Sequence, residues 1–129
     1  MSETIELPGF LSLAKKTAYL STGEYRLGSV IAKNGRMMAK GFNKYNHMNA
    51  LAREFFRYST VHAEIDALFR MDRNQIPGST IYVFRVRKDG SPGSSLPCYR
   101  CLNAMRSLGV RRIVYSTTEY PYYNVQKIE

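Results

Sequence analysis

The stretch STVHAEIDALFR (residues 59–70) determines how the rest of this 129-residue chain is interpreted. Four of its apolar side chains recur at the spacing of one helix face: Val61, Ile65, Leu68 and Phe69. Ser59 or Thr60 is a suitable N-cap, so a helix is predicted to begin there. His62 and Glu64 then lie in its first turn, where both could bind metal ions or protons.

The residues before this helix predict a further helix and a β-hairpin. Residues 9–21 (GFLSLAKKTAYLS) place apolar side chains near helical spacing. Residues 25–33 and 36–43 flank Asn34-Gly35, the strongest short-range signal for a two-residue hairpin turn. Residues 44–58 are polar and mixed, which indicates a loop with at most one helical turn.

The residues after the helix predict three strands and one more helix. In order, these elements are a strand over 79–87, a loop over 88–96, a helix over 97–108, and strands over 110–116 and 122–128. The first strand is apolar on both faces, which is typical of a central strand. Gly109 is a suitable stop for the helix. This alternation predicts an α/β fold with helices on both faces of a sheet.

Length and composition favour one domain, residues 1–129, located in the cytoplasm. With 44% hydrophobic and 22% charged residues, the chain can bury a core. No apolar run approaches the ~20 residues that span a bilayer, so no membrane partner is expected. Residues 1–8 include Glu3 and Glu6 instead of the basic and apolar regions of a secretory signal.

The charge balance favours anionic partners. Nineteen Lys and Arg against ten Asp and Glu give a net charge of +9. Such a field attracts nucleotides, nucleic acid and acidic surfaces, and charge alone does not choose among them. Arg85, Arg87 and Lys88 leave the central strand towards the loop that precedes the cysteines. A phosphate contact and a merely solvated strand end are both open interpretations of these three residues.

The two cysteines and one histidine predict a metal site. Cys98 and Cys101 are three residues apart, which favours metal or redox chemistry over a disulfide. With His62 and Glu64 they give the order H-x-E…P-C-x-x-C, which marks zinc-dependent base deaminases. A catalytic zinc ion has three protein ligands and a fourth position for water, whereas a structural one has four protein ligands. The chain has no third cysteine, so a catalytic Zn²⁺ site with Glu64 as the adjacent base is predicted.

With these motifs the sequence resembles the zinc-dependent cytidine and deoxycytidylate deaminase superfamily, in particular its small single-domain members. Three stretches carry the resemblance: residues 59–70, residues 81–101 (IYVFRVRKDGSPGSSLPCYRC) and GFN at 41–43. The family implies a three-layer α/β/α cytidine-deaminase-like fold around a central mixed five-stranded sheet. It also implies that His62, Cys98 and Cys101 bind zinc. Glu64 would be the catalytic proton shuttle.

The resemblance extends to the substrate pocket. Asn43 matches an asparagine that contacts sugar or base in relatives, and Ala63 would offer its backbone to the amide edge of the substrate. His47, the only other histidine, follows the second strand and is a candidate substrate contact. Small members of the superfamily are commonly homodimers or higher oligomers, so a homo-oligomer is expected.

The implied reaction is hydrolysis of the exocyclic amine at C4 of cytosine, which gives uracil and ammonia. The substrate would be a free (deoxy)cytidine nucleoside or nucleotide, with deoxycytidylate as the first choice because the positive charge suits a phosphate. The alternative is a deaminase of cytosine, or of adenine, in single-stranded DNA or RNA. The net charge of +9 would attract the nucleic-acid backbone, and the sixteen Phe and Tyr residues could stack on bases. A third hypothesis is a catalytically inactive relative that serves as a nucleic-acid-binding or scaffold module. Glu64 argues against it, because such a module does not need a carboxylate that transfers protons.

The segment 122–128 discriminates between the first two hypotheses. An antiparallel edge strand there resembles the free-nucleoside branch, whereas a parallel strand after a helix resembles the nucleic-acid editors. Only about five residues separate this segment from the preceding strand, and so short a connection favours a hairpin.

Overall fold

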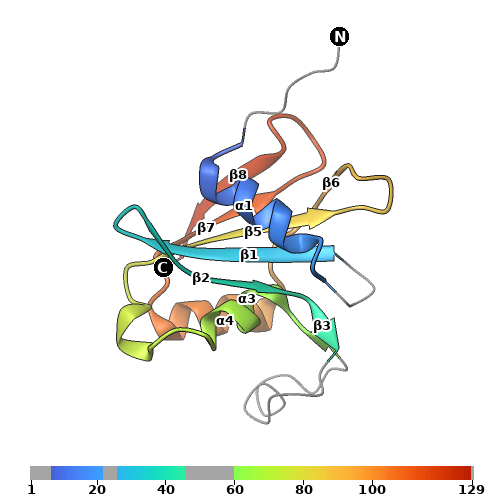
Figure 1. The fold of residues 1–129 in the computed structure, drawn as a ribbon. Helices are drawn as coiled ribbons and strands as arrows, with labels where there is room; N and C mark the ends of the chain where they lie inside the picture. The colour runs from blue at the N-terminus through green and yellow to red at the C-terminus, as the bar shows by residue number, and fades with distance from the viewer. Residues whose placement is uncertain (1–6, 22–25, 46–59, 129) are drawn as a thin grey trace.

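The structure is a computed structural model that describes residues 7–21, 26–45 and 60–128 (Figure 1). Its helices are α1 (Gly9–Ala18), α3 (Ala63–Leu68), the 3-10 helix η1 (Arg73–Gln75) and α4 (Tyr99–Leu108). Its longer strands are β1 (Arg26–Lys33), β2 (Arg36–Phe42), β5 (Thr80–Val86), β7 (Arg112–Ser116) and β8 (Tyr123–Lys127). Its two-residue strands are β3 (Lys44–Tyr45), β4 (Thr60–Val61) and β6 (Pro92–Gly93).

The main sheet is mixed and has six strands. Five of them follow the order β2-β1-β5-β7-β8, and β6 pairs with β5 beside this path. β5 and β7 are parallel, whereas the other pairs are antiparallel. The sheet contains the five predicted strands and one further strand, β6. β6 was not predicted, because its two residues are too few to show an alternating pattern. β3, which lies in the predicted loop, pairs with β4 in a separate two-stranded sheet.

Two hairpins confirm predictions made from short connections. Asn34 (φ 53°) and Gly35 (φ 75°) both adopt the left-handed conformation that a type I′ turn requires between β1 and β2. At the other edge of the sheet, β8 returns antiparallel to β7, with Tyr123 opposite Ser116. The C-terminal segment therefore forms the antiparallel edge strand expected of the free-nucleoside branch.

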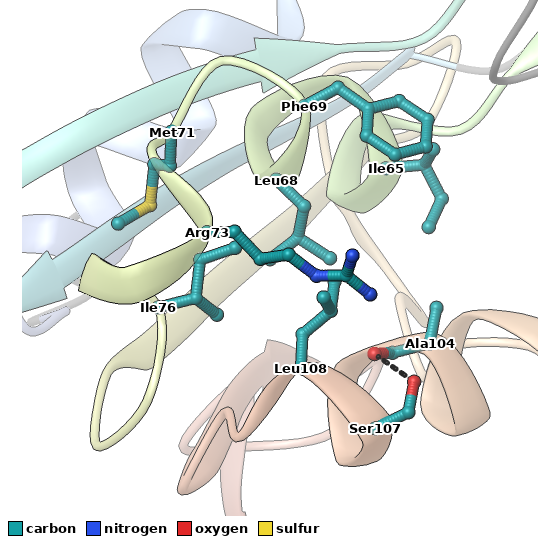
Figure 2. A pocket seen from close by; sticks show the side chains of 9 residues that line it. All are labelled: Ile65, Leu68, Phe69, Met71, Arg73, Ile76, Ala104, Ser107 and Leu108. Carbon is teal, nitrogen blue, oxygen red and sulfur yellow. Dashed lines mark hydrogen bonds between the residues drawn. The ribbon is translucent and has the colours of Figure 1, made fainter.

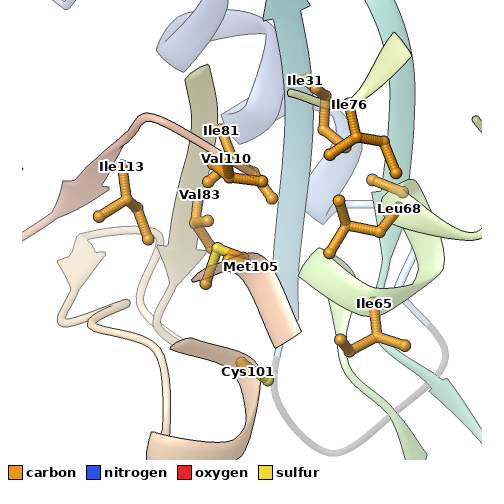
Figure 3. Close-up of a cluster of buried hydrophobic side chains, with 11 residues drawn as sticks. Ile31, Ile65, Leu68, Ile76, Ile81, Val83, Cys101, Met105, Val110 and Ile113 are labelled. Atoms are coloured by element: carbon orange, nitrogen blue, oxygen red, sulfur yellow. The ribbon is translucent and has the colours of Figure 1, made fainter. Parts of the chain in front are cut away.

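Helices cover both faces of the sheet, as predicted (Figure 1). On one face, α1 encloses a core that includes Leu11 and Phe84. On the other face, α3 and α4 enclose a core that includes Ile31, Val83 and Met105 (Figure 3). β5 contributes to both cores, which confirms it as the central two-sided strand. No helix in the described part of the chain is long and apolar enough to cross a membrane.

Two glycines let α1 and α3 approach the sheet closely. A Cβ atom at Gly28 would lie 2.2 Å from the carbonyl oxygen of Ala14 in α1. A Cβ atom at Gly41 would lie 2.5 Å from the nitrogen of Ala67 and 2.6 Å from the oxygen of Ala63, both in α3. These neighbours are backbone atoms, which cannot rotate away. The two helices therefore rest directly on strand backbone at these points.

The start of α3 differs from the prediction. Because β3 and β4 pair, the chain stays extended through Val61 and up to His62 (φ −70°, ψ 149°), which is the N-cap. The helix begins at Ala63, so the predicted cap at Thr60 is wrong. The alternative cap, Ser59, lies outside the described residues. Pairing with a strand elsewhere in the chain thus overrides the local helix signal.

The start of α4 is also later than predicted, whereas its end is confirmed. Cys98 (φ −67°, ψ 164°) is extended and is the N-cap, so the helix begins at Tyr99 and not at Pro97. Gly109 (φ 88°) ends the helix in the left-handed conformation. His62 and Cys98 thus occupy the same position, each immediately before the first turn of a helix.

Candidate active site

Three side chains that can bind a metal ion converge where α3 and α4 begin. The Nδ1 atom of His62 lies 3.3 Å from the sulfur of Cys101 and 3.9 Å from that of Cys98, and the two sulfurs are 3.4 Å apart. A tetrahedral zinc ion, with Zn–S of about 2.3 Å and Zn–N of about 2.0 Å, needs ligand separations of roughly 3.5–3.8 Å. The donor set and its spacing therefore fit zinc after small side-chain adjustments. The structure brings together all three predicted ligands.

The two cysteines differ in their exposure. Cys98 precedes the first turn of α4 and is exposed, whereas Cys101 lies one turn further on and is fully buried. A metal ion at this site would thus be held from the protein side by Cys101 and would face the solvent beside Cys98.

Two buried hydrogen bonds fix the start of α3. The Oδ1 atom of Asn43 accepts a bond of 2.7 Å from the N–H of Ala63, and the hydroxyl of Ser29 donates a bond of 2.7 Å to the Ala63 carbonyl. Ser29 lies in β1 and Asn43 directly follows β2, so the sheet holds both backbone groups of Ala63. Sequence reasoning missed Ser29, whose only signal is a lone hydroxyl among the apolar residues in the middle of β1.

The structure describes two of the three predicted substrate contacts. Asn43 is buried and lines the same cavity as His62 and Glu64, which agrees with its predicted place at the pocket. The N–H of Ala63 is engaged by the Asn43 side chain in this structure. Contact of either residue with a substrate stays a prediction. His47 lies outside the described residues.

Glu64 places a carboxyl group next to the three metal-binding side chains. Its side chain is only 3% exposed. Burial raises the pKa of this carboxyl above its usual range, while the charge of nearby His62 and a hydrogen bond with Cys101 oppose the rise. Burial also raises the pKa of the Cys101 thiol, and the negative charges of Glu64 and Cys98 add to that effect. A cation between these groups would offset their mutual repulsion.

A cavity of about 290 Å³ opens beside these groups. Its lining residues are Leu27, Asn43, His62, Glu64, Arg85, Ser94, Ser95, Leu96, Pro97 and Cys98. This volume is close to the lower limit of the range for small-molecule pockets, which is about 300 Å³. Sequence reasoning missed Leu27 and the wall formed by residues 94–96. Nothing in a turn-rich loop shows that it folds back over the metal-binding residues.

Two buried serines hold that wall in place. The Ser95 hydroxyl donates to the Val83 carbonyl (2.8 Å) and accepts from the Ser116 N–H (2.7 Å). The Ser116 hydroxyl donates to the Gly93 carbonyl (2.6 Å) and accepts from the Arg85 N–H (3.0 Å). These bonds join β5, β6 and the end of β7. The segment that leads to Cys98 and Cys101 therefore has a fixed path.

A second cavity, of about 320 Å³, lies between α3, η1 and α4 (Figure 2). Its lining is mainly apolar and includes Ile65, Phe69 and Leu108, with Arg73 and Ser107 as polar side chains. The described residues that line it include no acid, histidine or cysteine. His62, Glu64 and Cys98, which are candidates for metal binding and proton transfer, line the first cavity instead.

The family model for the cytidine and deoxycytidylate deaminase zinc-binding region matches residues 3–117 of this chain. The chain belongs to this family. The match confirms the resemblance noted in the sequence and makes the chain a zinc-dependent hydrolytic deaminase. Glu64 and the three side chains that could hold the metal all lie within the matched residues.

Individual members of the family are similar in sequence and in fold. The deoxycytidylate deaminase of Mycobacterium phage D29 is 29% identical over 125 residues, covering 82% of this chain and 90% of the phage protein. The dCMP deaminase from the cyanophage S-TIM5, in apo form, matches with a TM-score of 0.62 and 22% identity over 87% of this chain and 82% of that one. The cytidine deaminase from Burkholderia pseudomallei matches with a TM-score of 0.66 and 21% identity over 92% and 90%. These matches confirm the cytidine-deaminase-like fold.

Proposed function

We propose that this chain converts cytosine to uracil in free (deoxy)cytidine nucleosides or nucleotides. Deoxycytidylate is the leading candidate among these substrates. The observation that carries the proposal is the buried Glu64 carboxyl beside His62, Cys98 and Cys101, in a cavity open to a ligand. The phage D29 relative is named a deoxycytidylate deaminase, and the S-TIM5 enzyme has a structure in complex with dCMP and dUMP. Both names support a nucleotide substrate.

His62, Cys98 and Cys101 would hold the zinc ion. Bound there, zinc supplies Lewis-acid activation of a water molecule. Two thiolates would neutralise the charge of the ion and leave it a modest Lewis acid, so an adjacent base is needed. Glu64, two residues after His62, would be that base.

Glu64 would act as the proton shuttle. Its carboxylate takes one proton from the attacking water and delivers it to ring N3, while the water oxygen forms a bond to C4. Glu64 then passes the second proton to the exocyclic amine, the C4–N bond breaks, and ammonia leaves. One water molecule is consumed and uracil is formed. Asn43 and the backbone of Ala63 would orient the base and sugar, with His47 as a further candidate contact.

Single-stranded nucleic acid is the second candidate substrate. Tyr99 (76% exposed) follows Cys98 at the edge of the cavity and could stack on a neighbouring base. Leu96 (53% exposed) lines the cavity and could pack against a base. The net charge of +9 would favour a nucleic-acid backbone. The antiparallel β8 supports the free nucleotide instead, since a parallel strand there was expected of nucleic-acid editors.

A cytoplasmic location and a homo-oligomeric state complete the proposal. Free thiols that serve as metal ligands suit a reducing compartment. Near the C-terminal edge of the sheet, Tyr120 (82% exposed) and Val125 (51% exposed) offer apolar surface to a second copy of the chain.

A competition assay tests the substrate. Zinc-loaded protein is given dCMP and a cytosine-containing single-stranded oligonucleotide together, and mass spectrometry measures uracil in each pool. We expect conversion of dCMP to dUMP and no change in the oligonucleotide. Uracil in the oligonucleotide alone would favour the second candidate. No uracil in either pool, with one zinc ion bound per chain, would reject cytosine as the substrate base.

A further inference from the structure

Arg85 points towards the cavity that holds the metal-binding residues. Along β5, Ile81 and Val83 belong to the core under α3 and α4, whereas Phe84 and Val86 belong to the core under α1. Because successive side chains of a strand alternate between its faces, Arg85 projects from the same face as Val83. It accordingly lines the cavity together with the candidate catalytic residues.

Gly93 leaves room for the Arg85 side chain. The two residues are opposite each other in the β5–β6 pair. A Cβ atom at Gly93 would lie 3.0 Å from Cδ of Arg85 and 3.1 Å from its Cγ. Because glycine lacks this atom, the aliphatic part of the Arg85 side chain packs against the backbone of β6. The backbone N–H of Arg85 donates a hydrogen bond to the Ser116 hydroxyl. The neighbouring strands thus position the arginine beside the cavity.

Arg85 also sets the charge of the cavity. Of the lining residues in the described part of the chain, it alone is a lysine or arginine. A phosphate monoester carries about 1.5–2 negative charges at pH 7. Its entry would be unfavourable near the Glu64 carboxylate without a cationic partner. A guanidinium group is well suited, because its planar fork can donate two parallel hydrogen bonds to a phosphate.

We propose that Arg85 binds the phosphate of the nucleotide substrate and thereby makes the enzyme prefer nucleotides to nucleosides. The inference rests on the proposed function, since it takes the base to lie at the metal-binding side chains. The phosphate then lies at the side of the cavity where Arg85 of β5 lines it. Arg85 is a specificity-determining residue in this arrangement, and Gly93 is the neighbour that gives it space.

Binding of the reaction product tests this inference without turnover. Titration calorimetry on zinc-loaded protein measures the affinity for dUMP and for deoxyuridine in the wild type, Arg85→Gln and Arg85→Lys. Arg85→Gln should weaken dUMP binding about tenfold to hundredfold and change deoxyuridine binding by less than about twofold. Arg85→Lys keeps the charge but loses the fork, so its dUMP affinity should be intermediate.

Arg36→Gln is the matched control. Arg36 pairs with Lys33 at one end of β1, whereas Arg85 pairs with Leu27 near the other end. The control removes the same charge away from the cavity and should leave dUMP affinity unchanged. Added NaCl should weaken dUMP binding in the wild type and much less in Arg85→Gln, because the salt-sensitive contact is already gone.

Three outcomes would overturn the inference. Equal loss of dUMP and deoxyuridine affinity in Arg85→Gln would mean that the arginine only shapes the pocket. Unchanged dUMP affinity would mean that it does not contact the phosphate. A wild type that binds neither ligand would also reject it. A protein that binds dUMP through Arg85 but does not convert dCMP would retain this inference and lose the proposed function.

Discussion

At the scale of single residues, two buried carboxyl groups of α3 have different surroundings. Asp66 accepts a hydrogen bond of 3.2 Å from the N–H of Phe42 and lies 3.4 Å from Nε of Arg70, so it ties the helix to β2. Glu64 instead lines the cavity, and burial raises the pKa of its carboxyl. Burial of an ionisable group beside a cavity is typical of residues that transfer protons.

Glu64→Gln should therefore abolish deamination of dCMP in a folded protein. The amide has nearly the same shape but cannot take up and release the proton, so kcat should fall by at least about 100-fold. Zinc content should stay the same, and the melting temperature should be unchanged or higher because a buried acid is removed. Asp66→Asn is the control, with a lower melting temperature and a largely retained kcat. Activity of Glu64→Gln within tenfold of wild type would contradict the mechanism.

At the scale of secondary-structure elements, the bonds of Ser116 decide how β6 and the wall over the cavity are held. Ser116→Ala removes a fully buried hydroxyl, which donates to the Gly93 carbonyl in a buried bond and accepts from the Arg85 N–H in a partly buried one. We expect a loss of about 1–3 kcal/mol in the free energy of unfolding, measured by urea denaturation.

Ser107→Ala is the control for this effect. The Ser107 hydroxyl is exposed on α4 and donates a hydrogen bond of 3.1 Å to the Ala104 carbonyl of the same helix. Its removal should change the free energy of unfolding by less than about 0.5 kcal/mol. Equal urea midpoints for the two variants would show that the buried serine network does not hold the wall.

The elements that could be predicted from the sequence are those with a local signal. Asn34-Gly35 specifies its own turn. The H-x-E and C-x-x-C motifs were sufficient to predict that His62, Cys98 and Cys101 lie together, close enough to hold one metal ion. β6 was not predicted, because its two residues are too few to show an alternating pattern. The true start of α3 was not predicted either, because it depends on the pairing of β4 with β3, which lies about 16 residues earlier in the chain. The bonds between Ser95 and Ser116 span 21 residues, and no pattern in either segment indicates the other.

At the scale of the whole molecule, a metal ion would join two elements that are far apart in the sequence. His62 precedes α3 and the two cysteines belong to the start of α4, so one ion would connect both helices. α3 has only six residues, and so short a helix is not stable by itself. Its position depends on the sheet beneath it, and a metal ion beside it would hold it further.

Removal of zinc by a chelator should lower the melting temperature by more than about 5 °C, because metal binding adds directly to the stability of the folded state. Scanning calorimetry with and without the chelator measures the change. Cys98→Ser should bind little zinc, melt near the temperature of the chelated wild type and be insensitive to the chelator. Full zinc content in Cys98→Ser would show that the ligand assignment is wrong.

The close contacts at Gly28 and Gly41 restrict how this sequence can vary. Every other amino acid has a Cβ atom, so neither position offers a conservative replacement, and even alanine would push α1 or α3 away from its strand. Apolar core positions, by contrast, accept several side chains of similar volume. In a library that randomises each position and selects for folded protein, the survivors should keep glycine at these two sites while their neighbours vary. The thickness of the domain at these points is thus set by the absence of side chains.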